Sequence, residues 1–322
     1  MTSSVFSAVA RCLAPVLAAA ALAGAAPAQA DDNPLAGMPF YVDPISAAMR
    51  ASAAQPDSAE LARVANTPQA YWLDQAFPAG TVGSTVARHT GAAAAAGAMP
   101  VLVIYAIPHR DCGSYAAGGF SSGAAYRTWI DSVADGIGGN PAAIILEPDA
   151  LAMADCLSGD QRQERFDLIN YAVDTLGRNP GTSVYVDAGH SRWVSAGEMA
   201  NRLNQAGVGR ARGFALNSTN YFTTEEEIGY GDEVSGMTGG AHYVIDTSRN
   251  GNGPAEGDPY GWCNPAGRAL GVAPTTDTAS PRADAYLWVK RVGESDGSCG
   301  SGEPAAGHFV SDYAINLARN AG

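Results

Sequence analysis

The stretch Ala143-Ile144-Ile145-Leu146-Glu147-Pro148-Asp149-Ala150-Leu151 decides the fold, because an apolar run ends there abruptly at two carboxyl groups and a proline. Large apolar residues in succession suit a strand that is covered on both faces. Pro148 has no amide hydrogen to give to a central ladder, so the chain must leave the sheet at that point. Asp149 is therefore expected at the carboxyl end of a buried strand. The simpler alternative is that Glu147 and Asp149 only cap the next helix.

The same pattern recurs along the chain. Strands are predicted at 39–44, 101–106, 143–146, 183–186, 213–216, 243–245 and 286–289, with helices at 45–52, 58–65, 81–96, 124–137, 161–176, 196–204, 224–234 and at the C-terminus. Strands that alternate with helices predict an α/β fold with a parallel sheet. Seven strands fit either a (β/α) barrel short of the usual eight or a doubly wound sheet. A single domain is expected, because neither a linker nor an internal repeat divides the chain.

Polar residues follow the predicted strands. In both architectures, functional groups gather at the carboxyl ends of the strands. The residues at those ends are Asp111, Asp149, Asp187, Asn217, Asp246, Arg249, Lys290, Glu294 and Asp296. Acids scattered at random would fall on both rims and on the helices, so this pattern predicts an acid-lined site at one rim.

The first 30 residues have the features of a secretory signal peptide. Arg11 supplies the positive charge, an Ala/Leu/Val run follows, and Ala28-Gln29-Ala30 is a small-x-small cleavage site. We therefore expect a secreted domain over residues 31–322, with a retained membrane anchor as the alternative. The formal net charge of -13 argues against nucleic acid and against an anionic membrane as partner. A neutral substrate and a monomer are expected.

Converging carboxyl groups can serve metal binding or hydrolysis by an acid and a base. No metal and no other cofactor is expected, because the acids lie one per strand, no D-x-D-x-D loop occurs, and the histidines lack ligand spacing. The chain also lacks Gly-x-Ser-x-Gly and has no G-x-G-x-x-G after its first strand. Cleavage of a glycosidic bond fits better, since it needs one protonated carboxyl and a second carboxylate at the sugar ring. A neighbour such as Asp111 would keep Asp149 protonated near neutral pH.

The five tryptophans divide by position. Trp193 and Trp262 follow acidic rim segments and suit stacking on sugar rings, whereas Trp129 and Trp288 fall where core packing is expected. Trp72 fits either role. His190 follows a strand without a serine elbow nearby, so we expect it to contact sugar.

Five segments resemble glycoside hydrolase family 6, a cellulase family of endoglucanases and cellobiohydrolases. They are Tyr105-Ala106-Ile107-Pro108-His109-Arg110-Asp111-Cys112, Glu147-Pro148-Asp149-Ala150-Leu151, Tyr185-Val186-Asp187-Ala188-Gly189-His190, Trp262-Cys263-Asn264, and Leu287-Trp288-Val289-Lys290 with Gly293-Glu294-Ser295-Asp296-Gly297. These segments occur in family order and span nearly the whole mature chain. The resemblance implies a distorted seven-stranded parallel (β/α) barrel that cleaves β-1,4-glucan with inversion at the anomeric carbon.

The resemblance also implies roles for single residues. Asp149 matches the general acid, and Asp111 matches an acid that tunes it and helps move a proton from the attacking water. Tyr105 matches a tyrosine that helps distort the sugar. Asp296 matches a debated base, for which a water chain to Asp111 is the rival. The remaining matches are a supporting acid, Asp187, and sugar-binding positions at His190, Trp193, Asn217, Trp262, Lys290 and Glu294.

Four cysteines remain once residues 1–30 are removed, and an even number in an exported protein predicts two disulfides. Sequence separation leaves all three pairings open, and the resemblance implies Cys112–Cys156 with Cys263–Cys299. Relatives often carry a serine that helps hold water near the position of Ala116 and Ala117.

The length of one loop separates exo from endo action. Only Gly297 and Ser298 lie between Asp296 and Cys299, where family cellobiohydrolases carry a long tunnel-roofing loop. We therefore expect an open cleft and an endo-β-1,4-glucanase. The alternatives are a glycosidase acting on another β-glucan and a non-catalytic polysaccharide-binding protein.

Overall fold

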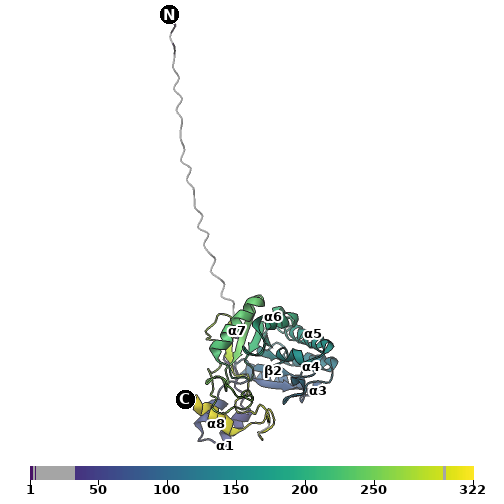
Figure 1. Cartoon of the computed structure of the whole chain (residues 1–322), viewed down its shortest axis with the longest axis vertical. Coiled ribbons are helices and arrows are strands. Elements are labelled where there is room, and N and C mark those ends of the chain that lie inside the picture. The colour runs from purple at the N-terminus through teal and green to yellow at the C-terminus, as the bar shows by residue number, and fades with distance from the viewer. Residues whose placement is uncertain (3, 5–32, 300–301) are drawn as a thin grey trace. The chain divides into compact units, whose positions relative to one another are not determined.

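A seven-stranded parallel sheet lies at the centre of the fold in the computed structural model, which describes residues 1, 2, 4, 33–299 and 302–322 (Figure 1). The strands are β1 (Tyr71–Asp74), β2 (Val101–Tyr105), β3 (Ala142–Leu146), β4 (Thr182–Asp187), β5 (Gly213–Leu216), β6 (His242–Asp246) and β7 (Ala283–Leu287). Their order in the sheet is their order in the chain, and each neighbouring pair is parallel. A doubly wound sheet would reverse its strand order at a switch point, so the barrel alternative is confirmed. The predicted signal peptide at 1–30 falls almost wholly outside the described residues.

Helices connect the strands and cover the outer face of the sheet. The connecting helices are α3 (Ala79–Ala95), α4 (Gly123–Ile137), α5 (Gly159–Leu176), α6 (Ala196–Gln205) and α7 (Thr224–Met237), with short 3-10 turns η1 (Asp111–Gly113), η2 (Ala152–Cys156) and η3 (Val208–Arg210). Figure 1 shows α3 to α6 side by side along one side of the sheet. Separately, α1 (Ala47–Ala54), α2 (Ala59–Ala65) and α8 (Ser311–Asn320) share an apolar cluster with Trp288.

The starts of the helices follow from single residues. Ser122, Ser158, Ser195 and Thr223 each accept a hydrogen bond from the third amide of the helix that follows. Such side chains satisfy amides that have no partner inside the helix. At Ser158 the bond is reciprocated by Gln161, which completes a capping box.

The pleat of the strands divides their side chains between two cores. The inner core holds Val101, Val103, Ala143, Ile145, Tyr185, Ala215, Val244, Ala285 and Leu287, whereas Leu102, Ile104, Ile144, Leu146, Val184, Val186, Phe214, Leu216 and Ile245 pack under the helices. Because residues from all the strands after β1 meet inside, the sheet must curl around a common interior. Within residues 33–299 no ladder joins β1 to β7. The two edges are joined instead by single bonds, such as that from the Ala70 amide to the Trp288 carbonyl at 3.0 Å. The barrel is therefore incomplete and distorted.

One predicted strand is wrong. At 39–44, Phe40 forms only an isolated parallel bridge with Met99, and prolines at 39 and 44 limit further pairing. The first strand is Tyr71–Asp74, whose four residues are too few to show a clear period. The last strand also begins earlier than predicted, at Ala283, because buried Asp284 breaks its apolar run while pairing with Arg212 at 2.8 Å.

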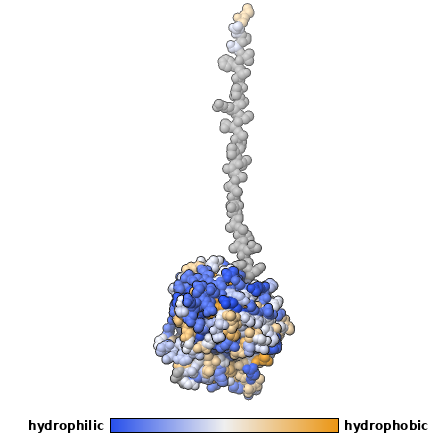
Figure 2. All heavy atoms as spheres, turned by 90° about the vertical axis from the view of Figure 1, so that its right-hand side faces the viewer, coloured by the Kyte–Doolittle hydropathy of each residue, from blue (hydrophilic) through white to orange (hydrophobic). Residues whose placement is uncertain are grey.

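The surface is mixed in character. Figure 2 shows hydrophilic and apolar residues interspersed on the face it displays. Within the described part of the chain, no helix has the length and apolar character needed to cross a membrane.

Candidate active site

Four carboxyl groups meet at the carboxyl end of the sheet. Asp187 is the last residue of β4, Asp111 begins η1 beyond β2, and Asp149 and Asp296 lie on the loops that follow β3 and β7. Burial raises the pKa of Asp149 well above its ordinary value, and the charges of Asp187, Asp111 and Asp296 raise it further. Such a raised pKa favours the protonated carboxyl group that a proton donor requires.

The backbone holds Asp149 in place. Its main chain has left-handed geometry, with φ of 68°, and its amide donates to Asp187 Oδ1 at 2.9 Å. The same oxygen of Asp187 also accepts the Gly189 amide at 2.9 Å. Burial raises the pKa of Asp187 to about 6, although these hydrogen bonds oppose the shift. Among the described residues, the buried Oδ1 atom of Asp149 has no hydrogen-bond partner, so its capacity to form a hydrogen bond is unused.

Asp111 lies on the loop after β2, where the chain again turns left-handed, with φ of 58°. Its Oδ2 atom accepts the Ala116 amide at 2.7 Å, so the loop with two alanines fixes this acid through its main chain. Burial raises the pKa of Asp111. The loop also carries Tyr115, which is 47% exposed and whose ring centre lies 5.5 Å from that of Trp262.

Asp296 has a different environment, because two cations hold it. Lys290 Nζ lies 2.9 Å from Oδ1, and Arg249 Nη1 lies 2.8 Å from Oδ2. The Tyr221 hydroxyl and the Asn264 amide also donate to Oδ2, at 3.1 and 3.0 Å. Burial disfavours the charge, but Arg249 and Lys290 outweigh it and hold the pKa of Asp296 well below its usual range. Asp296 is thus a permanent anion and a weak proton acceptor.

Aromatic side chains lie on the loops that follow β4, β5 and β6. Trp193 and Trp262 are each 40% exposed, as contact with a sugar ring would need. The His190 ring stacks on Phe222 with centres 4.1 Å apart and lies 5.3 Å from the Trp193 ring centre. Burial lowers the pKa of His190 to about 4, so this histidine is neutral at pH 7.

Two adjacent glutamates of helix α7 hold the segment 190–193, which carries His190 and Trp193. Glu227 Oε1 accepts from the Ser191 amide at 3.0 Å and from its hydroxyl at 2.7 Å. Glu226 pairs with Arg192 at 2.5 Å. The residues on either side of Ser191 are therefore fixed by carboxylates from the first turn of a neighbouring helix.

The other predicted residues are placed as follows. Tyr105 ends β2 beneath the Arg110 guanidinium, whose central carbon lies 4.2 Å from the ring centre, and burial raises the pKa of Tyr105. Asn217 is fully buried, and its amide bonds the main chain at Phe222 and Asp246. This geometry suits support of the 217–222 turn better than direct contact with sugar. Trp72 donates to the Val289 carbonyl at 2.8 Å.

Two disulfides fix the loops around the acids. The bonds join Cys112 to Cys156 and Cys263 to Cys299, the pairing that the resemblance implies. Trp129 and Trp288 are 0% and 2% exposed, which confirms the predicted core positions. Among the described residues, no group of three or more His, Cys, Asp or Glu side chains is arranged to hold a metal ion.

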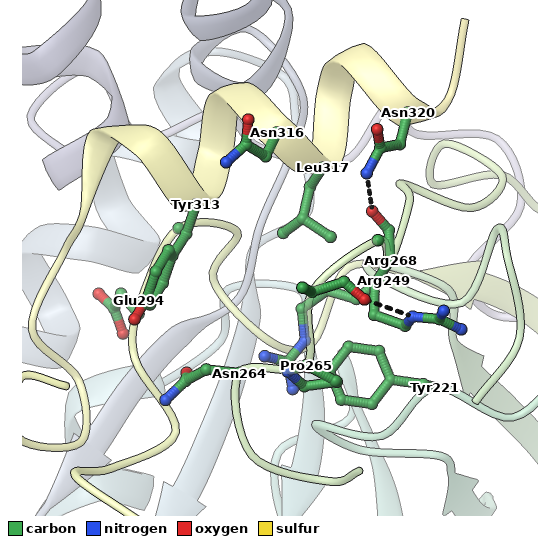
Figure 3. A pocket seen from close by; sticks show the side chains of 13 residues that line it. Tyr221, Arg249, Asn264, Pro265, Arg268, Glu294, Tyr313, Asn316, Leu317 and Asn320 are labelled. Carbon is green, nitrogen blue, oxygen red and sulfur yellow. Dashed lines mark hydrogen bonds between the residues drawn. The ribbon is translucent and has the colours of Figure 1, made fainter. Parts of the chain in front are cut away.

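A pocket of about 340 Å³ lies between α8 and the segment 264–268. Figure 3 shows Tyr313, Asn316 and Leu317 of α8 on one side and Asn264, Pro265 and Tyr221 on the other. Glu294 lies on its wall and pairs with Arg291 at 2.9 Å, while burial raises the pKa of Glu294. The pocket shares Tyr221, Arg249 and Asn264 with the network around Asp296.

The model of the family described as "Glycosyl hydrolases family 6" matches residues 32–321. The chain belongs to this family. Its relatives include Endoglucanase A of Cellulomonas fimi, 49% identical over 88% of this chain, and Endoglucanase 1 of Streptomyces halstedii, 41% identical over 92% of this chain and 94% of the relative. The chain spans 61% of the length of the C. fimi protein.

A solved family 6 structure supports the fold. The endoglucanase Cel6 of Mycobacterium tuberculosis, in complex with methyl-cellobiosyl-4-deoxy-4-thio-β-D-cellobioside, is 72% identical with a TM-score of 0.89. The match covers 90% of this chain and 99% of that one. The predicted curled seven-stranded α/β fold is therefore that of family 6.

Sequence reasoning missed several residues of this family 6 site. Arg249 was placed on the rim but was given no role, although it pairs with Asp296. Tyr115, Tyr221, Phe222 and Glu227 were not singled out. They lie on loops or in the first turn of a helix, where no period marks them, and only their partners in space reveal them.

Proposed function

We propose that this chain is a secreted, monomeric endo-β-1,4-glucanase that cleaves internal bonds of cellulose or a soluble β-glucan with inversion. The observation that carries the proposal is Asp149, whose carboxyl Oδ1 atom is buried without a hydrogen-bond partner and whose neighbours include three other acids. Endoglucanase relatives and the complex of a similar endoglucanase with a cellobiosyl analogue support the substrate class. The signal peptide predicted at 1–30 supports export.

In this mechanism Asp149 protonates the leaving glycosidic oxygen while water attacks the opposite face of the sugar ring. The raised pKa of Asp111 makes its carboxylate the better proton acceptor, so the proton of the attacking water passes toward Asp111. Asp296 keeps its charge and stabilises the positive charge that develops on the sugar. Asp187 orients Asp149 by accepting a hydrogen bond from the main-chain amide of Asp149.

Sugar contacts follow from exposure and position. Trp193 and Trp262 provide exposed rings for stacking, and neutral His190 offers a ring nitrogen for hydrogen bonding. Lys290 and Glu294 are assigned to the sugar by their position on the Asp296 side, although they are only 8% and 7% exposed. Tyr105 is the residue that we expect to distort the sugar ring.

The test compares wild type with Asp149→Asn on a soluble cellulose derivative, with viscosity and reducing ends measured together. We expect wild type to lower viscosity early and the Asp149→Asn enzyme to lose about 10³-fold in rate. Proton NMR of the first product should show the α-anomer. Equal activity of the two proteins would remove Asp149 as the acid, and release of cellobiose without loss of viscosity would reject endo action. Faster cleavage of another β-glucan would favour that substrate, and an inactive wild type that binds glucan would favour the non-catalytic alternative.

A further inference from the structure

The loops that carry Asp111 and Asp149 have an unfavourable backbone. Non-glycine residues with positive φ occur at His109, Asp111 and Cys112 on one loop and at Glu147 and Asp149 on the other. A residue with a Cβ atom keeps this conformation only where its surroundings hold it. The relative position of the two acids therefore depends on groups that bind both loops.

Arg165 of α5 binds both loops at once. Its Nη1 atom donates to the Ala150 carbonyl at 3.0 Å, directly after Asp149. Its Nη2 atom donates to the Pro108 carbonyl at 3.0 Å and to the His109 carbonyl at 2.7 Å, shortly before Asp111. The side chain is only 2% exposed, so water does not compete for these bonds.

The chemistry of the side chain suits this task. A guanidinium group is planar and presents its donors in a fixed fork, so carbonyl groups bound to its two ends keep a set separation. An ammonium group is a point charge and cannot impose that geometry. Buried Glu147 adds to the arrangement, since its charge acts on Arg165 and its oxygens accept the Ala106 and Ile107 amides that lead into the Asp111 loop.

We propose that Arg165 is a positioning residue that sets the proton donor Asp149 in register with Asp111. This inference rests on the proposed function. The Cys112–Cys156 bond ties the same loops through partly exposed residues, whereas Arg165 ties them through a buried side chain that is 2% exposed. Loss of Arg165 should therefore impair proton donation more than substrate binding.

The experiment uses two substrates that differ in their need for an acid. Cellotetraose has a poor leaving group and requires protonation, while 2,4-dinitrophenyl β-cellobioside releases a stable phenolate without it. The variants are Arg165→Met, which keeps bulk, and Arg165→Lys, which keeps charge. The matched control is Arg162→Met on the same helix. Arg162 is 41% exposed, pairs with Asp155 at 3.5 Å and donates to the Ala154 carbonyl at 3.0 Å, so its contacts lie on the Asp149 loop alone.

For Arg165→Met we expect kcat on cellotetraose to fall about 10- to 100-fold, because small misplacement of a catalytic group is costly. KM should stay within about 2-fold, as it does when ground-state binding is intact. The loss on the dinitrophenyl substrate should be at least about five-fold smaller, because its leaving group does not use the acid. The kcat of Arg165→Lys on cellotetraose should lie between those of wild type and Arg165→Met. The kcat of Arg162→Met should equal that of wild type on both substrates.

Equal losses on the two substrates, or no loss on either, would overturn the proposal. Should Arg165→Met fail to fold, as judged by its thermal unfolding curve, the ratio of losses for Arg165→Lys decides in the same way. Failure of wild type to cleave cellotetraose would reject the proposed function, and the Arg165 inference with it. That result differs from one in which wild type is active and the Arg165 variants lose equal activity on the two substrates, which would reject the Arg165 inference alone.

Discussion

Replacing Asp187 by Asn tests how the site keeps Asp149 protonated. Asparagine keeps an Oδ1 acceptor for the Asp149 and Gly189 amides, each 2.9 Å away, so the turn can stay in place. The negative charge disappears. Burial is the main cause of the raised pKa of Asp149 and the Asp187 charge is the second, so the substitution should lower that pKa without restoring it to normal.

The size of the shift follows from Coulomb's law. Two unit charges about 6 Å apart in an effective dielectric constant of about 20 interact by about 2.8 kcal/mol, which equals about 2 pKa units. The pKa of Asp187 is itself raised to about 6, so its charge is present only at higher pH. We therefore expect the alkaline limb of the activity profile to move down by about 1 to 2 pH units, with little change below about pH 6.

The assay is kcat/KM for cellotetraose from about pH 4 to about pH 10, because this ratio reports the ionisations of the free enzyme. The dinitrophenyl cellobioside serves as the control, since its profile should lack the limb that belongs to the acid. An alkaline limb that stays in place or moves up in Asp187→Asn would refute the electrostatic reasoning. A similar shift on both substrates would assign that limb to another group.

Three further substitutions test stability and binding. Lys290→Met removes one of the two cations bound to buried Asp296 and should cost about 3 kcal/mol of unfolding free energy at pH 7. Because the folded pKa of Asp296 is lowered, this stabilisation is present above the unfolded value of 3.8 and is lost as pH falls toward the folded pKa. Urea unfolding should thus show a smaller difference at about pH 3 than at about pH 7, and a constant difference would contradict the assignment. Trp193→Ala should raise KM for cellotetraose with little change in urea midpoint, since this side chain is 40% exposed. Trp129→Ala should cost about 3–5 kcal/mol, because Trp129 is fully buried, and the reverse pattern would exclude these roles.

The fold was largely predictable because buried parallel strands leave a strong signal. Six of the seven strands were found near their true positions, each as a short apolar run between helices. The first strand was misplaced, because Tyr71–Asp74 is too short for a period and its closure partners lie 217 residues away in the chain. Residues that pair across such separations carry no local mark.

The site was predictable as a rim of acids, but the differences among the acids were not. Asp149 and Asp296 look alike in the sequence, yet one is raised in pKa and the other is lowered. That difference arises mainly from two cations bound to Asp296, Lys290 nearby in the chain and Arg249, which lies 47 residues away. Similarly, Asn217 has the residue type of a sugar ligand, and only its burial and main-chain bonds indicate support of a turn.

The left-handed turns at the ends of the strands also bear on the choice between aspartate and glutamate. Asp111, Asp149, Asn217 and Asn264 all have positive φ, a conformation in which aspartate and asparagine are enriched because their short side chains tolerate it. Acid catalysis needs only a carboxyl group, but the turn restricts which residue can supply it. Glu147, the longer acid with positive φ, uses both carboxylate oxygens to accept main-chain amides. The main-chain geometry thus favours aspartate at position 149, whereas the acid chemistry alone would accept either aspartate or glutamate.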